Sequence, residues 1–178
     1  MDNLAEQSRS FPRPGTPYYG YIDDPNYQSR FLGSFKYTNK IILPLYRVLA
    51  PVFRLFKMKI YILTTKGRKS GLMRKTPLEY DEIDSVLHGA VANPRKSQWY
   101  KNIIANPDEV WAQIGSRKFH ARIEFLDDTG TIETMKYYIR THPSYADFIG
   151  WDPKIDDLET ADFSPVPKVW RFYRIYEY

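Results

Sequence analysis

The sequence contains no cysteine, and this absence excludes three kinds of site at once. Disulfide bonds, thiolate metal ligands and a cysteine nucleophile all require that side chain. Histidine is scarce as well, because His88, His120 and His142 are the whole complement and share no spacing typical of metal ligands. We therefore expect no metal site, so redox chemistry in this chain would depend on an organic cofactor.

Signatures of several other protein classes are also missing. No G-x-S-x-G segment is present, so the nucleophile elbow of serine hydrolases is not expected. The chain has neither the glycine spacing of a P-loop nor an RNP-like or helix-turn-helix pattern, and we expect no nucleic-acid partner. No secretory signal pattern is seen in the first residues, and the expected location is the cytoplasm.

The residues that are present favour a folded domain with a basic surface. Apolar residues make up 43% of the 178 positions and aromatic residues 16%, which is enough for a core and aromatic-lined cavities. Lysine and arginine number 26 against 21 aspartates and glutamates, which gives a net charge of +5. This charge favours an anionic partner such as a phosphorylated cofactor, an anionic lipid surface or nucleic acid.

One stretch concentrates basic charge and glycine: Leu63 to Leu78, with the sequence LTTKGRKSGLMRKTPL. Apolar and β-branched runs at Tyr61–Thr65 and Thr76–Tyr80 flank it, which predicts a strand, a loop and a second strand. Gly67 and Gly71 permit backbone conformations in which successive N–H groups converge on one point. With a serine hydroxyl and five cations nearby, the loop suits a phosphate or carboxylate group. The alternative is a solvated basic turn that binds nothing in particular.

Further strands and helices are predicted along the rest of the chain. Alternating or apolar runs predict strands at Ser85–Ala92, Glu109–Ile114, Lys118–Phe125 and Lys168–Tyr178. Short helices are predicted between them, and in the first of these Tyr100, Ile103 and Ile104 are expected to face inward. Antiparallel strands with a few helices fit a small barrel, since closure removes exposed sheet edges. The predicted fold class is α+β, mainly antiparallel β, with peripheral helices.

The residues before the barrel divide into two segments. Residues 1–33 are rich in proline, glycine and tyrosine, and we expect an extended N-terminal arm that docks on the domain or on another subunit, as in a homodimer. Residues 34–59 are predicted to form a basic amphipathic helical segment, and residues 60–178 the barrel domain. Ser34 to Lys57 carries five cations and no acid, and its apolar runs are far shorter than the ~20 residues of a membrane span. This segment either lies on an anionic membrane surface or covers the core of its own domain or a dimer interface.

Two motifs of the chain resemble a known family. TTKGRKSGLMRKTPL is followed downstream by QWYKNIIANPDEVWAQIGSRKFHAR. Together they resemble the deazaflavin-dependent nitroreductases and quinone reductases, whose members read roughly TTxGRKSGxxRxxPL and PxWYxNLxANPxVxVQxGxxxxxAR. The resemblance runs from about Ile60 to Trp151. It implies a split β-barrel of the FMN-binding kind and coenzyme F-420, an 8-hydroxy-5-deazaflavin whose tail bears a phosphate and several glutamate carboxylates.

The resemblance also implies which residues would bind this coenzyme. Residues of the basic loop would hold the phosphate and the tail, and others would lie against the ring or wall its pocket. The tail residues would be Arg68, Lys69, Ser70 and Arg74, and the ring residues Pro77, Ala92, Asn93 and Trp99. For Trp99 the alternative is an ordinary core position.

The stretch HPSYADFIGW resembles the family's substrate-side segment, which typically reads YPSYxxYxxW. Tyr145, Phe148 and Trp151 are therefore the expected substrate contacts. Tyr145 is the expected proton donor, and His142 is a second candidate because imidazole titrates near neutral pH. The alternative role of His142 is to end a helix. His142 and Phe148 stand where tyrosine is common in the family, and Ala92 lies near a serine position, so the resemblance constrains the acceptor less than the coenzyme.

The implied function is that of an oxidoreductase that transfers hydride from reduced coenzyme F-420 to a lipophilic acceptor, such as a quinone or a nitroaromatic compound. A cytoplasmic enzyme lying peripherally on the inner face of the membrane would meet such acceptors there. Two alternatives stay open. One is the same fold binding FMN or haem, and the other is a non-catalytic module whose basic hairpin and helix bind lipid or nucleic acid.

Overall fold

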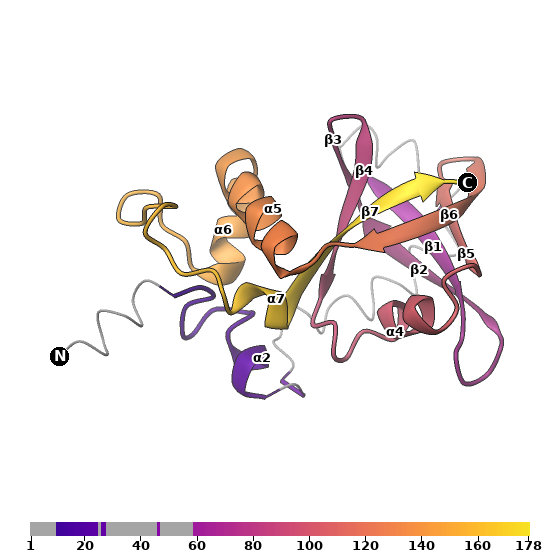
Figure 1. The fold of residues 1–178 in the computed structure, drawn as a ribbon, viewed down its shortest axis with the longest axis horizontal. Coiled ribbons are helices and arrows are strands. Elements are labelled where there is room, and N and C mark those ends of the chain that lie inside the picture. Colours follow the sequence, from indigo (N-terminus) through magenta and orange to yellow (C-terminus); the bar gives the residue numbers. More distant parts are fainter. Residues whose placement is uncertain (1–9, 25, 28–45, 47–58) are drawn as a thin grey trace. The chain divides into compact units, whose positions relative to one another are not determined.

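The computed structural model describes residues 10–24, 26–27, 46 and 59–178 (Figure 1). These residues form two compact units. The barrel unit comprises the described residues of 32–91, 97–125 and 173–178, and the helical unit those of 1–31, 92–96 and 126–172. Apart from Tyr46 and Lys59, the basic segment predicted at 34–59 lies outside the described residues. The expected division into arm, helical segment and barrel stays a prediction.

Seven strands form one sheet in the order β2-β1-β5-β6-β7-β4-β3. They are β1 (Ile60–Lys66), β2 (Met73–Glu79), β3 (Asp81–Ile83), β4 (Val86–Ala92), β5 (Val110–Ile114), β6 (Arg117–Phe125) and β7 (Trp170–Glu177). The pairs β1–β2, β1–β5, β3–β4, β5–β6 and β6–β7 are antiparallel. Figure 1 shows the sheet curling into a half-barrel. The predicted fold class, α+β with a mainly antiparallel split β-barrel, is confirmed.

Helices lie in both units. The barrel unit holds α4 (Gln98–Ala105), and the helical unit holds α2 (Gly20–Asp23), α5 (Asp128–Thr141), α6 (Pro143–Ile149) and α7 (Val166–Val169). Side chains just before the two longest helices satisfy N–H groups that have no partner within the helix. The hydroxyl of Ser97 accepts a hydrogen bond from the Tyr100 N–H of α4, and the Asp127 carboxylate accepts one from the Gly130 N–H of α5.

The core of the barrel unit forms where inward-facing residues of β1, β5, β6 and β7 meet α4. The alternation predicted for β6 is present, since Phe119 and Ala121 are buried while Lys118 and Arg122 are exposed. β1 has neighbours on both sides, β2 and β5, and its first six residues are all buried. The buried core residues of this cluster are Tyr61, Leu63, Ile103, Val110, Ala112, Phe119, Ala121, Tyr173 and Ile175.

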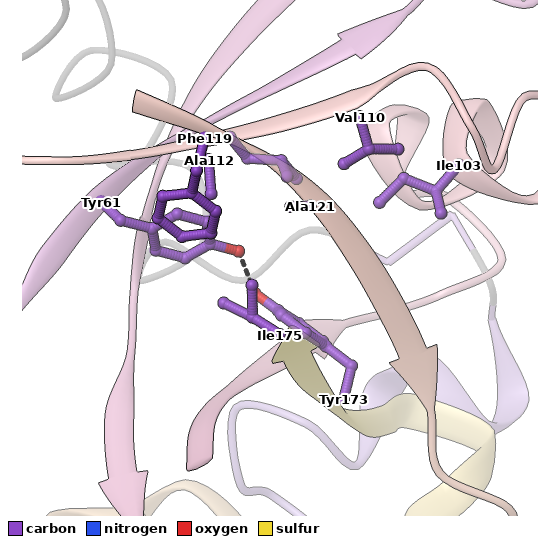
Figure 2. Packing of buried hydrophobic residues seen from close by; sticks show 9 residues of the cluster. Tyr61, Ile103, Val110, Ala112, Phe119, Ala121, Tyr173 and Ile175 are labelled. Atoms are coloured by element: carbon purple, nitrogen blue, oxygen red, sulfur yellow. Dashed lines mark hydrogen bonds between the residues drawn. The ribbon is translucent and has the colours of Figure 1, made fainter. Parts of the chain in front are cut away.

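A hydrogen bond between two tyrosines crosses this core. Figure 2 shows the hydroxyls of Tyr61 and Tyr173 pointing at each other, with 2.9 Å between their oxygens. Both residues are fully buried. Gly89 on β4 makes room for the pair, because a Cβ at that position would lie 2.3 Å from the Tyr173 hydroxyl oxygen. Only glycine fits there without moving the ring.

Tyr46 packs on the barrel unit. Its side chain is 3% exposed, and its hydroxyl donates to the carbonyl of Ile60 at 2.8 Å and accepts from the N–H of Gly115 at 3.0 Å. Burial raises the pKa of this hydroxyl above its ordinary value, the bond from Gly115 opposing the shift. Tyr46 therefore packs on the barrel unit, and both interpretations of the basic segment stay predictions.

Four details differ from the predictions. The strand expected from Lys168 begins at Trp170, because Val166–Val169 form α7. β2 begins at Met73 instead of Thr76, because pairing with β1 continues to Lys66, and Arg74 therefore lies in a strand. β3 was not expected, since its turn to β4 uses Asp84 and Ser85 at φ angles of 51° and 63°, and the second position of such a turn is usually glycine. The inward orientation expected for Ile104 is wrong: it is 60% exposed, and the polar Asn102 beside Ile103 is buried in its place.

Replacing Tyr61 with phenylalanine removes the hydrogen bond to Tyr173, and we expect the free energy of unfolding at pH 7 to fall by about 0.5–1.5 kcal/mol. Burial raises the pKa of the Tyr61 hydroxyl well above its ordinary value of 10.0, with a further contribution from Tyr173. Above pH ~10 the unfolded chain releases the Tyr61 proton, while the folded chain keeps it. The contribution of Tyr61 to stability is therefore fully present below pH ~10 and is lost as pH rises through the raised pKa of the folded protein.

Urea unfolding of the two proteins between pH 7 and 11 tests this expectation. The stability difference between wild type and Tyr61→Phe should shrink as pH rises above ~10. A Tyr178→Phe variant, changed at a residue that is 65% exposed, serves as the control and should follow wild type throughout. Parallel curves for wild type and Tyr61→Phe over the whole range would contradict the assignment.

Candidate functional site

The loop between β1 and β2 is shaped by its own backbone. The Gly67 N–H donates to the carbonyl of Leu72 at 2.9 Å, and the Gly71 N–H donates to the carbonyl of Gly67 at 2.8 Å. Gly71 has a φ of 67°, and a Cβ on Gly67 would lie 2.8 Å from the Ser70 hydroxyl oxygen. The positive φ of Gly71 is the conformation that the sequence suggested for a glycine, whereas Gly67 has no positive φ and a Cβ there would displace the Ser70 hydroxyl.

The expected convergence of backbone N–H groups on an anion is wrong for most of this loop. The N–H groups of Gly67 and Gly71 bond within the loop, and the Leu72 N–H donates to the Ser70 hydroxyl at 3.4 Å. The Arg68 N–H donates to the side-chain oxygen of Asn102 at 3.2 Å. The positive charge available to a ligand therefore comes mainly from side chains, since the turn and Asn102 use these four backbone donors.

A pocket of about 340 Å³ lies between this loop and α4. It is lined by Gly67, Arg68, Lys69, Ser70, Arg74, Thr76, Gln98, Trp99 and Asn102. The structure thus brings together five of the residues predicted for the coenzyme: Arg68, Lys69, Ser70, Arg74 and Trp99. The three cations among them are exposed to solvent. An open, cationic rim of this kind can receive an anionic group from solution.

Trp99 forms the aromatic part of the pocket wall. It is half-buried, and its ring meets the buried Tyr173 ring edge-on, with the centroids 5.5 Å apart and the planes at 71°. The two alternatives considered for Trp99 are compatible, because one edge packs on the core while another part lines the pocket.

The other residues predicted to contact the coenzyme ring do not line this pocket. Pro77 is buried in β2, opposite Ile62 of β1, and is not among the residues that line the pocket. Ala92 ends β4 and is half-buried. Asn93 follows it with a φ of 48°, is 5% exposed, and donates from its N–H to the Val169 carbonyl at 2.7 Å. Their part in a ring site stays a prediction.

The substrate-side residues predicted in α5 and α6 lie in an aromatic cluster of the helical unit. The Tyr145 ring stacks on that of Tyr138 with centroids 4.6 Å apart, and it lies 5.4 Å from Trp170 and 6.3 Å from Phe148. His142 ends α5: its N–H donates to the Tyr138 carbonyl, and its Nδ1 lies 2.8 Å from the Thr141 hydroxyl. Tyr145, Phe148 and His142 therefore belong to one cluster.

Trp151 belongs to a different aromatic group. It is 8% exposed and packs against Phe11 of the N-terminal arm and Phe163, with ring centroids at 5.2 Å and 5.8 Å, and these two rings also stack on each other. The arm is fixed there by an ion pair between Arg13 and Asp156, and the Arg13 guanidinium also donates to the Gly150 carbonyl at 3.1 Å. At Trp151 the structure shows the arm packing on its own chain.

Three residues that line the pocket were not expected from the sequence: Thr76, Gln98 and Asn102. Three amides recur at four-residue spacing along the helix, at Gln98, Asn102 and Asn106. Residues four apart lie on the same face of a helix, so this stripe could have marked the face of α4 that meets the loop. The position of Thr76 depends on the pairing register of β1 and β2, which places it opposite Leu63.

Comparison with known families supplies an identification. Residues 45–153, more than half of the chain, match the model of the family described as F420H(2)-dependent quinone reductase. The chain belongs to this family. It is a deazaflavin-dependent oxidoreductase, and its cofactor is coenzyme F-420. The resemblance noted in the two sequence motifs is thereby confirmed.

The chain is also similar to several solved structures. One is titled an F-420-H2 dependent reductase: it is 23% identical, and the match covers 65% of this chain and 92% of that one with a TM-score of 0.42. A putative pyridoxamine 5'-phosphate oxidase from Listeria innocua is 14% identical, with 69% and 86% covered and a TM-score of 0.44. An FAD-binding protein from Mesorhizobium loti is 21% identical, with 67% and 81% covered and a TM-score of 0.43.

The pocket fits one part of this coenzyme by its chemistry. A phosphate and carboxylates need cationic and hydroxyl donors, and Arg68, Lys69, Arg74 and Ser70 supply them at one rim. A Cβ on Gly67 would lie 2.8 Å from the Ser70 hydroxyl oxygen, so a side chain at this position would displace one of these donors. Among the described residues, no helix is long and apolar enough to cross a membrane.

The ion pair that fixes the arm gives a testable expectation. The Asp156 side chain is 7% exposed and that of Arg13 is 23% exposed, so Asp156→Asn leaves a largely buried guanidinium without its counter-charge. We expect the free energy of unfolding to fall by about 1–3 kcal/mol. The matched control is Glu177→Gln, which breaks the exposed pair with Arg117 and should cost less than about 1 kcal/mol. Equal losses in urea unfolding would show that the arm contact contributes no more than a surface pair.

Proposed function

We propose that the chain uses reduced coenzyme F-420 to reduce a lipophilic acceptor, such as a quinone or a nitroaromatic compound. The observation that carries the proposal is the pocket at the β1–β2 loop, where three cations and a hydroxyl face the same space as the Trp99 ring. This combination matches a ligand with an anionic tail and a flat aromatic head. The coenzyme, when bound, supplies the hydride.

The residues of the loop bind and orient the coenzyme in this proposal. Arg68, Lys69, Ser70 and Arg74 hold the phosphate and carboxylates of the tail, and Trp99 walls the space beside them. Each charge-assisted contact contributes about 1.5–3 kcal/mol when partly desolvated, and less at this exposed rim. We assign Pro77, Ala92 and Asn93 to the ring as a further part of the proposal. Their contribution would be to orient the ring and exclude water.

The acceptor site is proposed at the aromatic cluster of the helical unit. Tyr145 is half-buried among Tyr138, Phe148 and Trp170, a surface that suits a flat apolar molecule. Its hydroxyl is the proposed proton donor to the reduced acceptor. His142, within ring contact of Tyr138 and Tyr145, is the second candidate. Trp151 is proposed to support this region through the arm, because Phe11 covers its ring.

The setting of the enzyme is a further part of the proposal. A quinone-like acceptor is dissolved in lipid, and the basic segment Ser34 to Lys57 would bring a cytoplasmic protein to the inner face of the membrane through anionic headgroups. Tyr46 covers the barrel at one point of this segment, so the proposal places membrane contact on its other residues. We also propose that residues of this segment could contact a second copy of the chain in a homodimer.

Coenzyme binding is tested first by fluorescence titration with coenzyme F-420 and, in parallel, with FMN. We expect saturable binding of the deazaflavin, weakened at least about tenfold by the double change Lys69→Ala with Arg74→Ala, which corresponds to about 1.4 kcal/mol. The control is Arg117→Ala with Lys118→Ala, which removes the same charge from exposed positions on β6 away from the pocket. Its affinity should follow wild type.

Two outcomes of this titration would contradict the proposal. Binding of FMN alone would move the protein to another cofactor class. Equal weakening by both double variants would mean that net charge, and not the loop, attracts the coenzyme.

The proton-donor role is tested by Tyr145→Phe. We expect kcat to fall by about 10²-fold with the affinity for the coenzyme unchanged, because general acid catalysis typically contributes 10²–10⁴-fold. Tyr137→Phe, changed at a more exposed tyrosine of α5, is the control and should keep wild-type turnover. Steady-state kinetics with a soluble quinone measures both. Unchanged turnover in Tyr145→Phe would remove this residue from the reaction.

A further inference from the structure

A single buried amide joins three elements at the floor of the pocket. Asn102 of α4 is 6% exposed. Its side-chain N–H donates to the hydroxyl of Thr65 on β1 at 3.3 Å, and Thr65 is itself 1% exposed. Its side-chain oxygen accepts from the Arg68 backbone N–H at 3.2 Å and from the Arg68 Nη1 at 3.3 Å. Asn102 therefore uses both ends of its amide to tie the helix to the strand and to the loop.

These bonds hold the Arg68 side chain in one place. The Nη1 group donates to Asn102, and the Nη2 group donates to the side-chain oxygen of Gln98, one turn earlier on α4, at 3.1 Å. A guanidinium has five N–H donors, so two such bonds leave three for an anion. Binding to an arginine that is already held loses less side-chain entropy than binding to a mobile one, and the planar guanidinium keeps its orientation.

The other cations of the loop provide a contrast. Lys69 and Arg74 are exposed at the same rim, and helix α4 contributes Gln98, Trp99 and Asn102 to the pocket. Arg68 thus differs in having two helical side chains as hydrogen-bond acceptors. The neutral, buried side chain of Asn102 accepts hydrogen bonds from both the backbone and the guanidinium of Arg68.

We infer that Asn102 is a positioning residue of the coenzyme-tail site: it fixes the loop at Arg68 and orients that guanidinium before the anion arrives. The inference rests on the proposed function of the pocket and deepens it. Asn102 acts through Arg68, so its effect on affinity depends on the arginine being present. A buried amide with only a structural role would instead lower stability and leave coenzyme affinity unchanged.

A double-mutant cycle separates these roles. The dissociation constant of coenzyme F-420 is measured by fluorescence for wild type, Asn102→Ala, Arg68→Ala and the double variant. We expect each single change to weaken binding about tenfold, since either removes one oriented charge-assisted contact. Because both act through the same contact, the double variant should bind within about twofold of Arg68→Ala.

Asn106→Ala is the matched structural control. This amide follows the last residue of α4, donates to the carbonyls of Lys66 on β1 and of Asn102, each at 3.4 Å, and does not line the pocket. It should lower the melting temperature and leave the dissociation constant within about twofold of wild type, because it does not touch Arg68. Hydrogen exchange on the coenzyme-free proteins supplies a second readout: amides of residues 67–72 should exchange faster in Asn102→Ala than in Asn106→Ala.

Gln98→Ala is the second variant if Asn102→Ala fails to fold. Gln98 is exposed, and its loss should weaken binding about threefold in the wild-type background and leave Arg68→Ala unchanged. Fully additive effects in either cycle, or wild-type affinity in Asn102→Ala, would overturn the inference while the proposed function stands. A wild-type protein that binds no coenzyme would contradict the proposed function, and this inference would fall with it.

Discussion

The barrel unit depends on a polar contact inside an apolar core, the hydrogen bond between the Tyr61 and Tyr173 hydroxyls. β1 lies between β2 and β5 and buries its whole first half, so a hydroxyl on it must find a partner within the protein. Tyr173 on β7 supplies that partner, and Gly89 on β4 leaves room for it. Three strands are thereby fixed relative to one another around one contact. The Trp99 ring packs edge-on against the Tyr173 ring, so this residue of the pocket lining is in contact with the core.

The loop of the site follows a related rule, that buried donors and acceptors must be satisfied. Most backbone N–H groups of the Gly67–Leu72 turn are used by the turn or by Asn102, which leaves the binding of anions to side chains. Arg68 is held by α4, while Lys69 and Arg74 extend from the rim. The site therefore combines one guanidinium held by helix α4 with two exposed charges at the rim. Such a combination can attract a long anionic tail and fix one of its groups.

Much of this arrangement could be predicted from local patterns. The glycines of the β1–β2 turn, the alternation of β6 and the helical spacing near Ser97 each depend on residues close in sequence. The pairing of β1 with β2 beyond Thr76 could not be predicted so well, because its extent depends on register. The Asp84–Ser85 turn was missed because the pair contains no glycine, which is the usual second residue of such a turn, and Ser85 takes that place at a positive φ. The family motifs predicted residues by position, but the contacts of Asn102 depend on how α4 meets β1, which no local pattern encodes.

The central claim is that the space between the β1–β2 loop and α4 receives the tail of coenzyme F-420. Amide chemical-shift mapping of the isotope-labelled protein during a coenzyme titration tests it most directly. The account predicts the largest shifts at residues 67–72 and in α4, with small shifts at the exposed turn around Gly115. Shifts of equal size at both turns, or shifts confined to residues away from the pocket, would contradict it.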